Sequence, residues 1–137
     1  MQIITVIGED NSGKTTLFQY MLNQLKNSGA EIIIFSRLGQ NYDDFESILF
    51  WKGKKLAICS IGDAKKYIDE GLHKAKDSNP DYIINVVNTK FEKWYKDSFK
   101  KENIKLVYNT SENYIENQIR KRQEKYIEII SFLEKEN

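Results

Sequence analysis

The sequence predicts an α/β protein, a three-layer α/β/α sandwich built on a mostly parallel β-sheet. Short apolar segments rich in β-branched residues alternate along the chain with segments whose apolar residues recur at helical spacing. The apolar segments are nearly continuous, which is typical of parallel strands covered by helices on both faces. The 137 residues contain no repeat and no low-complexity linker, so we expect a single domain over residues 1–137.

The first part of the chain is expected to form a strand, a helix and a second strand. Residues 3–7 are apolar and β-branched and predict a buried strand. A helical stripe of apolar residues follows and continues to Gly29, which can end a helix in the left-handed conformation. Residues 32–35 form a continuous apolar run, which predicts a second strand buried on both faces.

A β-hairpin is expected over about residues 45–60. Residues 45–51 and 56–60 are apolar runs, and the turn between them falls at Gly53. The first arm would be an antiparallel strand at the edge of the sheet. The alternative is a short helix over residues 43–50.

The rest of the chain continues the alternation of helices and strands. A helical stripe begins at Asp63, and strands are expected over residues 82–87 and 104–108. An aromatic helical stripe lies between these two strands, and a long last helix is expected to start at Ser111. The residues of that last helix expected to face the core are Ile115, Ile119, Tyr126, Ile130 and Leu133.

One motif lies between the first strand and the first helix. Residues 8–15, with the sequence GEDNSGKT, follow the phosphate-binding loop pattern of a glycine, four residues, and Gly-Lys-Ser/Thr. Glycines let the loop close so that its N–H groups face an anion, and the helix N-terminus adds a favourable dipole. Lys14 offers a point charge to phosphates, and Thr15 offers a hydroxyl to Mg²⁺. The residues expected to bind a nucleotide are Gly8, Asp10, Asn11, Ser12, Gly13, Lys14, Thr15 and Thr16.

The strand, loop and helix of residues 1–37 resemble a P-loop NTPase. Residues 8–16 are similar to the loop of thymidylate-kinase-like nucleotide kinases, which often carry Gly-x-Asp-x-x-Gly-Lys-Thr-Thr. The segment also resembles small P-loop proteins of molybdopterin-cofactor assembly. The resemblance implies the P-loop NTPase fold, with ATP and Mg²⁺ as ligands. Residues 35–39 faintly resemble a kinase segment whose arginine holds the acceptor's phosphate, which makes Arg37 a candidate clamp or a solvated loop residue.

The ends of the other expected strands should meet the loop at the carboxyl edge of the sheet. The resemblance calls for an acid that helps to hold Mg²⁺ at the end of an apolar strand, but residues 56–60 end in Ser60. Asp63 arrives three residues later, either as a metal ligand acting through water or as the N-cap of the next helix. Residues 89–92 partly match the guanine-reading motif of GTPases, with Glu92 in place of Asp, so GTP is a weaker alternative to ATP.

Composition narrows the functional classes. The net charge is +1, with 21 basic and 20 acidic residues, so no overall field favours nucleic acid. No apolar stretch approaches the ~18 residues that a membrane helix needs, and no basic-then-apolar leader is present. Cys59 is alone and lies in an apolar run, which predicts a buried thiol. We therefore expect a cytoplasmic protein.

Two functions remain open from the sequence. The first is a minimal ATP- and Mg²⁺-dependent phosphotransferase, related to nucleotide or nucleoside kinases, with Lys14, Asp63 and Arg37 as catalytic candidates. Thr15 and Asp63 would hold the metal, and a small-molecule acceptor would receive the phosphoryl group. The second is a switch or assembly subunit that binds ATP or GTP with slow or no turnover, with a protein as its partner. The missing acid at the end of the strand and the absence of an inserted lid in the 137 residues favour the second function, whereas the kinase-like loop favours the first.

Overall fold

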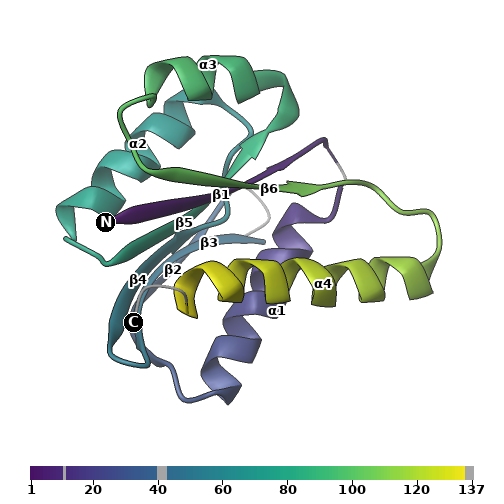
Figure 1. Ribbon diagram of the computed structural model, residues 1–137, viewed down its shortest axis with the longest axis horizontal. Helices are drawn as coiled ribbons and strands as arrows, with labels where there is room; N and C mark the ends of the chain where they lie inside the picture. The colour runs from purple at the N-terminus through teal and green to yellow at the C-terminus, as the bar shows by residue number, and fades with distance from the viewer. Residues whose placement is uncertain (11, 40–42, 135–137) are drawn as a thin grey trace.

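The computed structural model describes residues 1–10, 12–39 and 43–134. Within these ranges six strands form one mixed sheet in the order β2-β3-β4-β5-β1-β6, and helices cover both of its faces (Figure 1). The elements in chain order are β1 (Gln2–Gly8), α1 (Lys14–Asn27), β2 (Glu31–Leu38), β3 (Asp44–Trp51), β4 (Lys54–Cys59), α2 (Lys65–Asp77), β5 (Tyr82–Asn88), the 3₁₀ turn η1 (Thr89–Phe91), α3 (Glu92–Ser98), β6 (Ile104–Asn109) and α4 (Ile115–Glu134).

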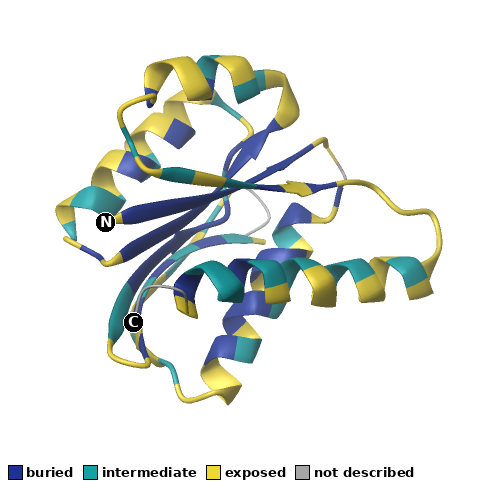
Figure 2. Ribbon diagram, in the orientation of Figure 1, coloured by how far each residue is buried: buried dark blue, intermediate teal, exposed yellow. Residues whose placement is uncertain are grey.

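The sheet is mostly parallel, as expected. Strand β1 pairs in parallel with β5 and β6, and β5 pairs in parallel with β4. Strand β3 runs antiparallel to both of its neighbours, β2 and β4. All residues of β1 and β5 are buried (Figure 2), which explains their continuous apolar sequences. The loop after β1 therefore leaves an interior strand, flanked by the carboxyl ends of β5 and β6.

The helices form two outer layers. Helices α1 and α4 cover one face of the sheet, and α2 and α3 cover the other (Figure 1). On the first face α1 and α4 also meet through an edge-to-face contact between Tyr20 and Tyr126, whose ring centroids are 5.6 Å apart. The helix residues buried on that face are Leu17, Phe18, Met21, Leu22, Leu25, Ile129 and Leu133.

A buried polar cluster joins the sheet to α3. The Thr5 hydroxyl donates to Asn85 Oδ1 at 2.6 Å and lies 2.8 Å from the Tyr95 hydroxyl. Asn85 Nδ2 donates to the same Tyr95 oxygen at 3.3 Å. Because these side chains are buried, their mutual hydrogen bonds replace those lost with water.

The expected hairpin is present, but it does not lie at the edge of the sheet. Strands β3 and β4 form it, with Gly53 in the turn at φ 76°. The edge strand is β2, which pairs outside β3, so the predictions of an edge hairpin and of a doubly buried second strand are both wrong. Ile33 and Ile34 are about half exposed. An apolar run alone does not distinguish a central strand from an apolar edge strand, because both carry the same side chains.

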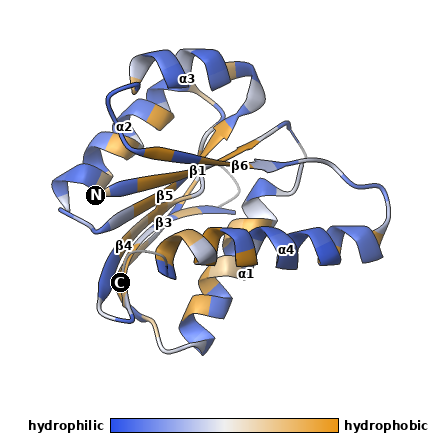
Figure 3. Cartoon of the chain, in the orientation of Figure 1, coloured by the Kyte–Doolittle hydropathy of each residue, from blue (hydrophilic) through white to orange (hydrophobic). Residues whose placement is uncertain are grey.

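The prediction for the last helix is correct in its second half, where Tyr126, Ile130 and Leu133 pack on the core, and wrong in its first half. The helix begins at Ile115 rather than Ser111, and Ile115 and Ile119 are 71% and 46% exposed. Its hydrophobic C-terminal half carries the packing, through the buried Ile129 and Leu133 (Figure 3). The N-terminal half of the helix extends past β6 (Figure 1), and its apolar residues Ile115 and Ile119 stay largely exposed there.

None of the helices in the described residues has the length and apolar character needed to cross a membrane.

Candidate functional site

The loop between β1 and α1 lies at the carboxyl edge of the sheet, and its two glycines are needed for different reasons. A Cβ added at Gly8 would lie 2.5 Å from Ser12 Oγ and 2.9 Å from the carbonyl oxygen of Asn109. Gly13 precedes α1 with φ 87°, a left-handed conformation that side chains disfavour. Gly8 thus permits a close approach, whereas Gly13 permits the turn into the helix.

Asparagines at the ends of the two neighbouring strands hold the loop. Asn109, at the end of β6, donates from Nδ2 to the Ser12 carbonyl at 2.7 Å. Asn88, at the end of β5, donates from Nδ2 to Asp10 Oδ1 at 2.6 Å. These two hydrogen bonds agree with the expectation that the ends of the neighbouring strands meet the loop. The roles of the two asparagines could not be predicted from the sequence, because any polar residue can end a strand.

The loop encloses a buried hydroxyl that has no partner. Ser12 is 8% exposed, and its Oγ is the one buried side-chain nitrogen or oxygen in the described residues that makes no hydrogen bond. A buried polar group without a partner is costly, and a missing ligand is one explanation for it. Ser12 lines a cavity of about 500 Å³ at the N-terminus of α1, together with Asp10, Gly13, Lys14, Thr15, Thr16, Ser60, Asp63 and Val86.

Lys14 is buried and folds back over the loop. Its Nζ donates to the carbonyl oxygens of Gly8, at 3.0 Å, and Glu9, at 2.6 Å. Burial lowers the pKa of the Lys14 ammonium, and nearby carboxylates oppose that shift. Those carboxylates, in decreasing order of effect, belong to Asp63, Asp10, Asp44 and Glu9. A ligand phosphate could exchange for the two carbonyls without moving the lysine out of the cavity.

Thr15 meets a carboxylate that the sequence analysis did not select as a metal ligand. Its Oγ1 donates to Asp44 Oδ1 at 3.1 Å, and the same oxygen accepts from Ser60 Oγ at 3.0 Å. Ser60 Oγ also accepts from the Phe45 N–H at 2.9 Å, which fixes the start of β3 against the end of β4. The predicted hairpin could have pointed to Asp44, because antiparallel pairing of β3 with β4 brings residue 44 to the end of β4.

Asp63 is not the N-cap of α2. The N-cap residue is Ala64, and it has no side-chain cap bond. Asp63 is exposed and lines the cavity beside Lys14 instead. Its carboxylate is therefore available to the loop, and the capping alternative is wrong.

Arg37, a predicted catalytic candidate, lies away from the cavity of the loop. Arg37 belongs to β2 rather than to a loop, and its guanidinium lies 5.4 Å from the centroid of the Phe35 ring. It is not among the residues that line the loop's cavity. Thr16 does line that cavity, and Asn11 lies outside the described residues.

A second cavity of about 660 Å³ adjoins the first through Asp63. It lies between the ends of β2, β3 and β4 and the helix α2. Its charged lining is mostly acidic, since Lys74 pairs with Glu46 and no other lysine or arginine in the described residues lines it. The lining residues are Leu38, Gly39, Asp44, Glu46, Cys59, Ile61, Asp63, Ala64, Tyr67, Glu70, Gly71 and Lys74.

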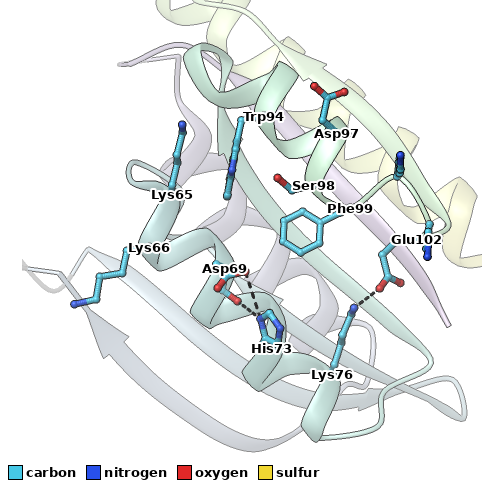
Figure 4. A pocket seen from close by; sticks show the side chains of 12 residues that line it. Lys65, Lys66, Asp69, His73, Lys76, Trp94, Asp97, Ser98, Phe99 and Glu102 are labelled. Carbon is cyan, nitrogen blue, oxygen red and sulfur yellow. Dashed lines mark hydrogen bonds and ion pairs between the residues drawn. The ribbon is translucent and has the colours of Figure 1, made fainter.

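A third cavity, of about 760 Å³, lies between α2 and α3, the two helices that cover the second face of the sheet (Figure 4). Lys65 lies 5.4 Å from the centroid of the Trp94 ring, and Lys76 pairs with Glu102. His73 is exposed and contacts Asp69 within its own helix. These are contacts of a solvated helix surface, and none of them brings reactive groups together.

The segment that partly matches a guanine-reading motif is engaged elsewhere. The Asn88 Oδ1 accepts from the Lys90 N–H at 3.1 Å and caps the turn η1. The Glu92 carboxylate contacts Lys96 at 2.7 Å and accepts from the Tyr108 hydroxyl at 2.9 Å. The hydrogen bond from Lys96 is the main cause that lowers the pKa of Glu92. The capped turn and the engaged carboxylate give this segment a structural role.

The described residues contain no cluster of three or more histidine, cysteine, aspartate or glutamate side chains that could hold a metal ion. A cation here would need phosphate oxygens as further ligands, which is how Mg²⁺ is commonly held at nucleotide sites. Comparisons with protein-family models, with curated proteins and with solved structures found no match to this chain.

Proposed function

We propose that this chain is a nucleotide-binding P-loop protein, and most simply a minimal ATP- and Mg²⁺-dependent phosphotransferase resembling nucleotide or nucleoside kinases. The observation that carries the proposal is the unpartnered, buried Ser12 hydroxyl beside the buried Lys14 ammonium, at the N-terminus of α1. A helix N-terminus, a lysine and an inward hydroxyl are together suited to a chain of phosphates.

Three residues that line the cavity have specific roles under this proposal. Lys14 exchanges the carbonyls of Gly8 and Glu9 for phosphate oxygens and stabilises the charge that develops on the transferring group. Thr15 would offer a hydroxyl to Mg²⁺, and Asp63, which lines the cavity and acts on Lys14, would meet the cation through water. The cation would offset phosphate charge that the surrounding carboxylates repel.

The adjoining acidic cavity is the candidate acceptor site. Its acidic side chains outnumber its one lysine and would repel a phosphorylated acceptor, so an acceptor without a phosphate, such as a nucleoside or another small alcohol, suits it better. Arg37 stays the candidate clamp for a phosphorylated acceptor, although it does not line this cavity. The base for the acceptor hydroxyl would come from the acids at the junction of the two cavities.

The second candidate is a nucleotide-dependent switch or assembly subunit, which binds ATP or, less well matched, GTP without transferring phosphate. The observation that favours it is Ser60, which occupies the end of β4, where the resemblance calls for an acid.

Turnover with an added acceptor distinguishes the two candidates. Protein would be incubated with ATP, Mg²⁺ and either nucleosides or nucleoside monophosphates, and ADP and phosphorylated products would be followed by phosphorus NMR. The kinase proposal predicts acceptor-dependent ADP formation that Lys14→Ala abolishes, with nucleosides preferred over monophosphates. Binding of ATP without any acceptor-dependent ADP would favour the switch.

A further inference from the structure

We propose that Asp44, from the antiparallel strand β3, is the carboxylate that organises the divalent-cation site, in the place of an acid at the end of β4. This inference rests on the proposed nucleotide site. Nothing in the β1–α1 motif points to Asp44, which lies 29 positions beyond Thr15 in the chain. The feature that selects it is the shared contact of its Oδ1 with two hydroxyls.

Asp44 lines the adjoining acidic cavity, and two hydrogen bonds hold it against residues that line the cavity of the loop. Its Oδ1 accepts from Thr15 at 3.1 Å and from Ser60 at 3.0 Å. Ser60 is itself held by two hydrogen bonds with the backbone of Phe45, because its N–H donates to the Phe45 carbonyl at 2.9 Å and its Oγ accepts from the Phe45 N–H at 2.9 Å. The serine at the end of β4 therefore does not replace a carboxylate. It holds one that comes from the neighbouring strand.

The Thr15 contact has a direct chemical consequence. A hydroxyl that gives its proton to a carboxylate keeps its lone pairs for a cation and becomes a better ligand. Such outer-shell acceptors orient the ligands of metal sites and contribute to metal affinity. The other oxygen of the Asp44 carboxylate can accept from a water of the cation, since Mg²⁺ usually keeps several waters at protein sites.

The charges around the cavity require a cation. The carboxylates of Glu9, Asp10, Asp44 and Asp63 are near enough to Lys14 to raise its pKa, and two of them, Asp10 and Asp63, line its cavity. The surroundings of the single lysine are therefore acidic before any nucleotide enters. A triphosphate would add several negative charges to this group. A divalent cation between the phosphates and Asp44 offsets this repulsion, so nucleotide affinity should depend strongly on Mg²⁺.

Asp63 differs from Asp44 in each of these respects. It is exposed and makes no hydrogen bond with the described part of the chain, whereas Asp44 is partly buried and held by two hydroxyls. Asp63 has the largest effect among the acids on Lys14, which associates it with the lysine rather than with Thr15. Asp63 and Asp44 would therefore respond differently to neutralisation.

The experiment measures ATP affinity by calorimetry, with Mg²⁺ and with EDTA, for the wild type and three variants. Asp44→Asn removes the charge but keeps an oxygen that can accept from Thr15 and Ser60. Asp63→Asn and the neighbouring Asp43→Asn make the same change of charge at exposed positions. Circular dichroism and urea unfolding would establish that each variant is folded. Electron paramagnetic resonance of Mn²⁺, titrated in the presence of ATP, would report on the cation directly.

We expect Mg²⁺ to strengthen ATP binding by the wild type. Asp44→Asn should reduce that effect, and Mn²⁺ affinity, by about 10- to 100-fold, as for outer-shell residues of metal sites. Asp43→Asn should stay within about threefold, because surface charges act through solvent. Asp63→Asn, the rival for the cation, should reduce the Mg²⁺ effect by less than Asp44→Asn does, because Asp63 acts mainly on Lys14. If Asp44→Asn does not fold, Asp63→Asn decides alone: a Mg²⁺ effect reduced less than about 10-fold supports the inference, and a greater loss overturns it.

The same measurements distinguish failure of the Asp44 inference from failure of the proposed nucleotide site. A wild type that binds ATP equally well with Mg²⁺ and with EDTA would overturn the inference and leave the nucleotide site intact. An Asp44→Asn variant that is folded and keeps the wild-type Mg²⁺ effect would do the same. A wild type that binds no nucleotide under either condition would overturn both the inference and the proposed function.

Discussion

Replacement of Gly8 with alanine should damage both the fold and the loop. Gly8 does not have a positive φ, so an alanine there meets no backbone strain, and the cost comes from contact alone. Its Cβ would lie 2.5 Å from Ser12 Oγ and 2.9 Å from the Asn109 carbonyl, so the loop or β6 must move. Overpacking of this kind costs about 1–3 kcal/mol. Disturbing the buried bond from Asn109 to the Ser12 carbonyl adds about 1 kcal/mol.

The free energy of unfolding of Gly8→Ala should therefore fall by about 2–4 kcal/mol, a large part of the stability of a small domain. Urea unfolding followed by circular dichroism would measure the fall. Gly53→Ala is the matched control, because Gly53 has φ 76° but no atom within 4 Å of an added Cβ. The control should lose only the ~1–2 kcal/mol of left-handed strain and keep nucleotide binding. A Gly8→Ala protein as stable as the wild type, and equal to it in nucleotide binding, would refute the argument from close packing.

Two further predictions concern buried groups away from the loop. Tyr95→Phe leaves Asn85 Nδ2 without its buried acceptor, so the free energy of unfolding should fall by about 1–3 kcal/mol in urea titrations. Burial raises the pKa of Tyr95. The protonated Tyr95 phenol therefore stabilises the folded state fully below the pKa of the unfolded phenol, near 10. That stability is lost as the pH rises from there through the higher pKa of the folded state. The wild type should lose stability more steeply than Tyr95→Phe above that pH, and parallel curves would contradict this assignment. Burial also raises the pKa of Cys59 to about 11, so at pH 8 a disulfide reagent should react about 100-fold more slowly with the folded protein than with the unfolded chain. Equal rates would show that the thiol is accessible and ionised.

The parts of the fold that local chemistry determines could be predicted from the sequence. The β1 strand, the glycine at the end of α1 and the turn at Gly53 follow from apolar runs and from residues suited to left-handed backbone. The position of β2 could not be predicted, because the order of strands depends on long-range pairing. The exposed Ile115 and Ile119 show the same limit, since a helical stripe does not reveal where its partner surface ends.

In the candidate site, too, local residues could be predicted from the sequence and long-range contacts could not. Ser12, Gly13 and Lys14 are adjacent in sequence, so their motif predicts a shared loop, and the structure brings them together around one cavity. The contacts of Asp44 with Thr15 and Ser60 depend on the register of the hairpin. A linear motif contains no such information, which is why the sequence pointed to Asp63.

The most direct test of the central claim is a calorimetric titration of ATP and GTP, with Mg²⁺, into the wild type and Lys14→Ala. Lys26→Ala, an exposed lysine in the last turn of the same helix, is the matched control. We expect binding by the wild type and by Lys26→Ala, with ATP preferred, and loss of binding in a folded Lys14→Ala. Equal binding by Lys14→Ala and the wild type, or no binding by the wild type, would contradict the claim that this loop holds the phosphates of a nucleotide.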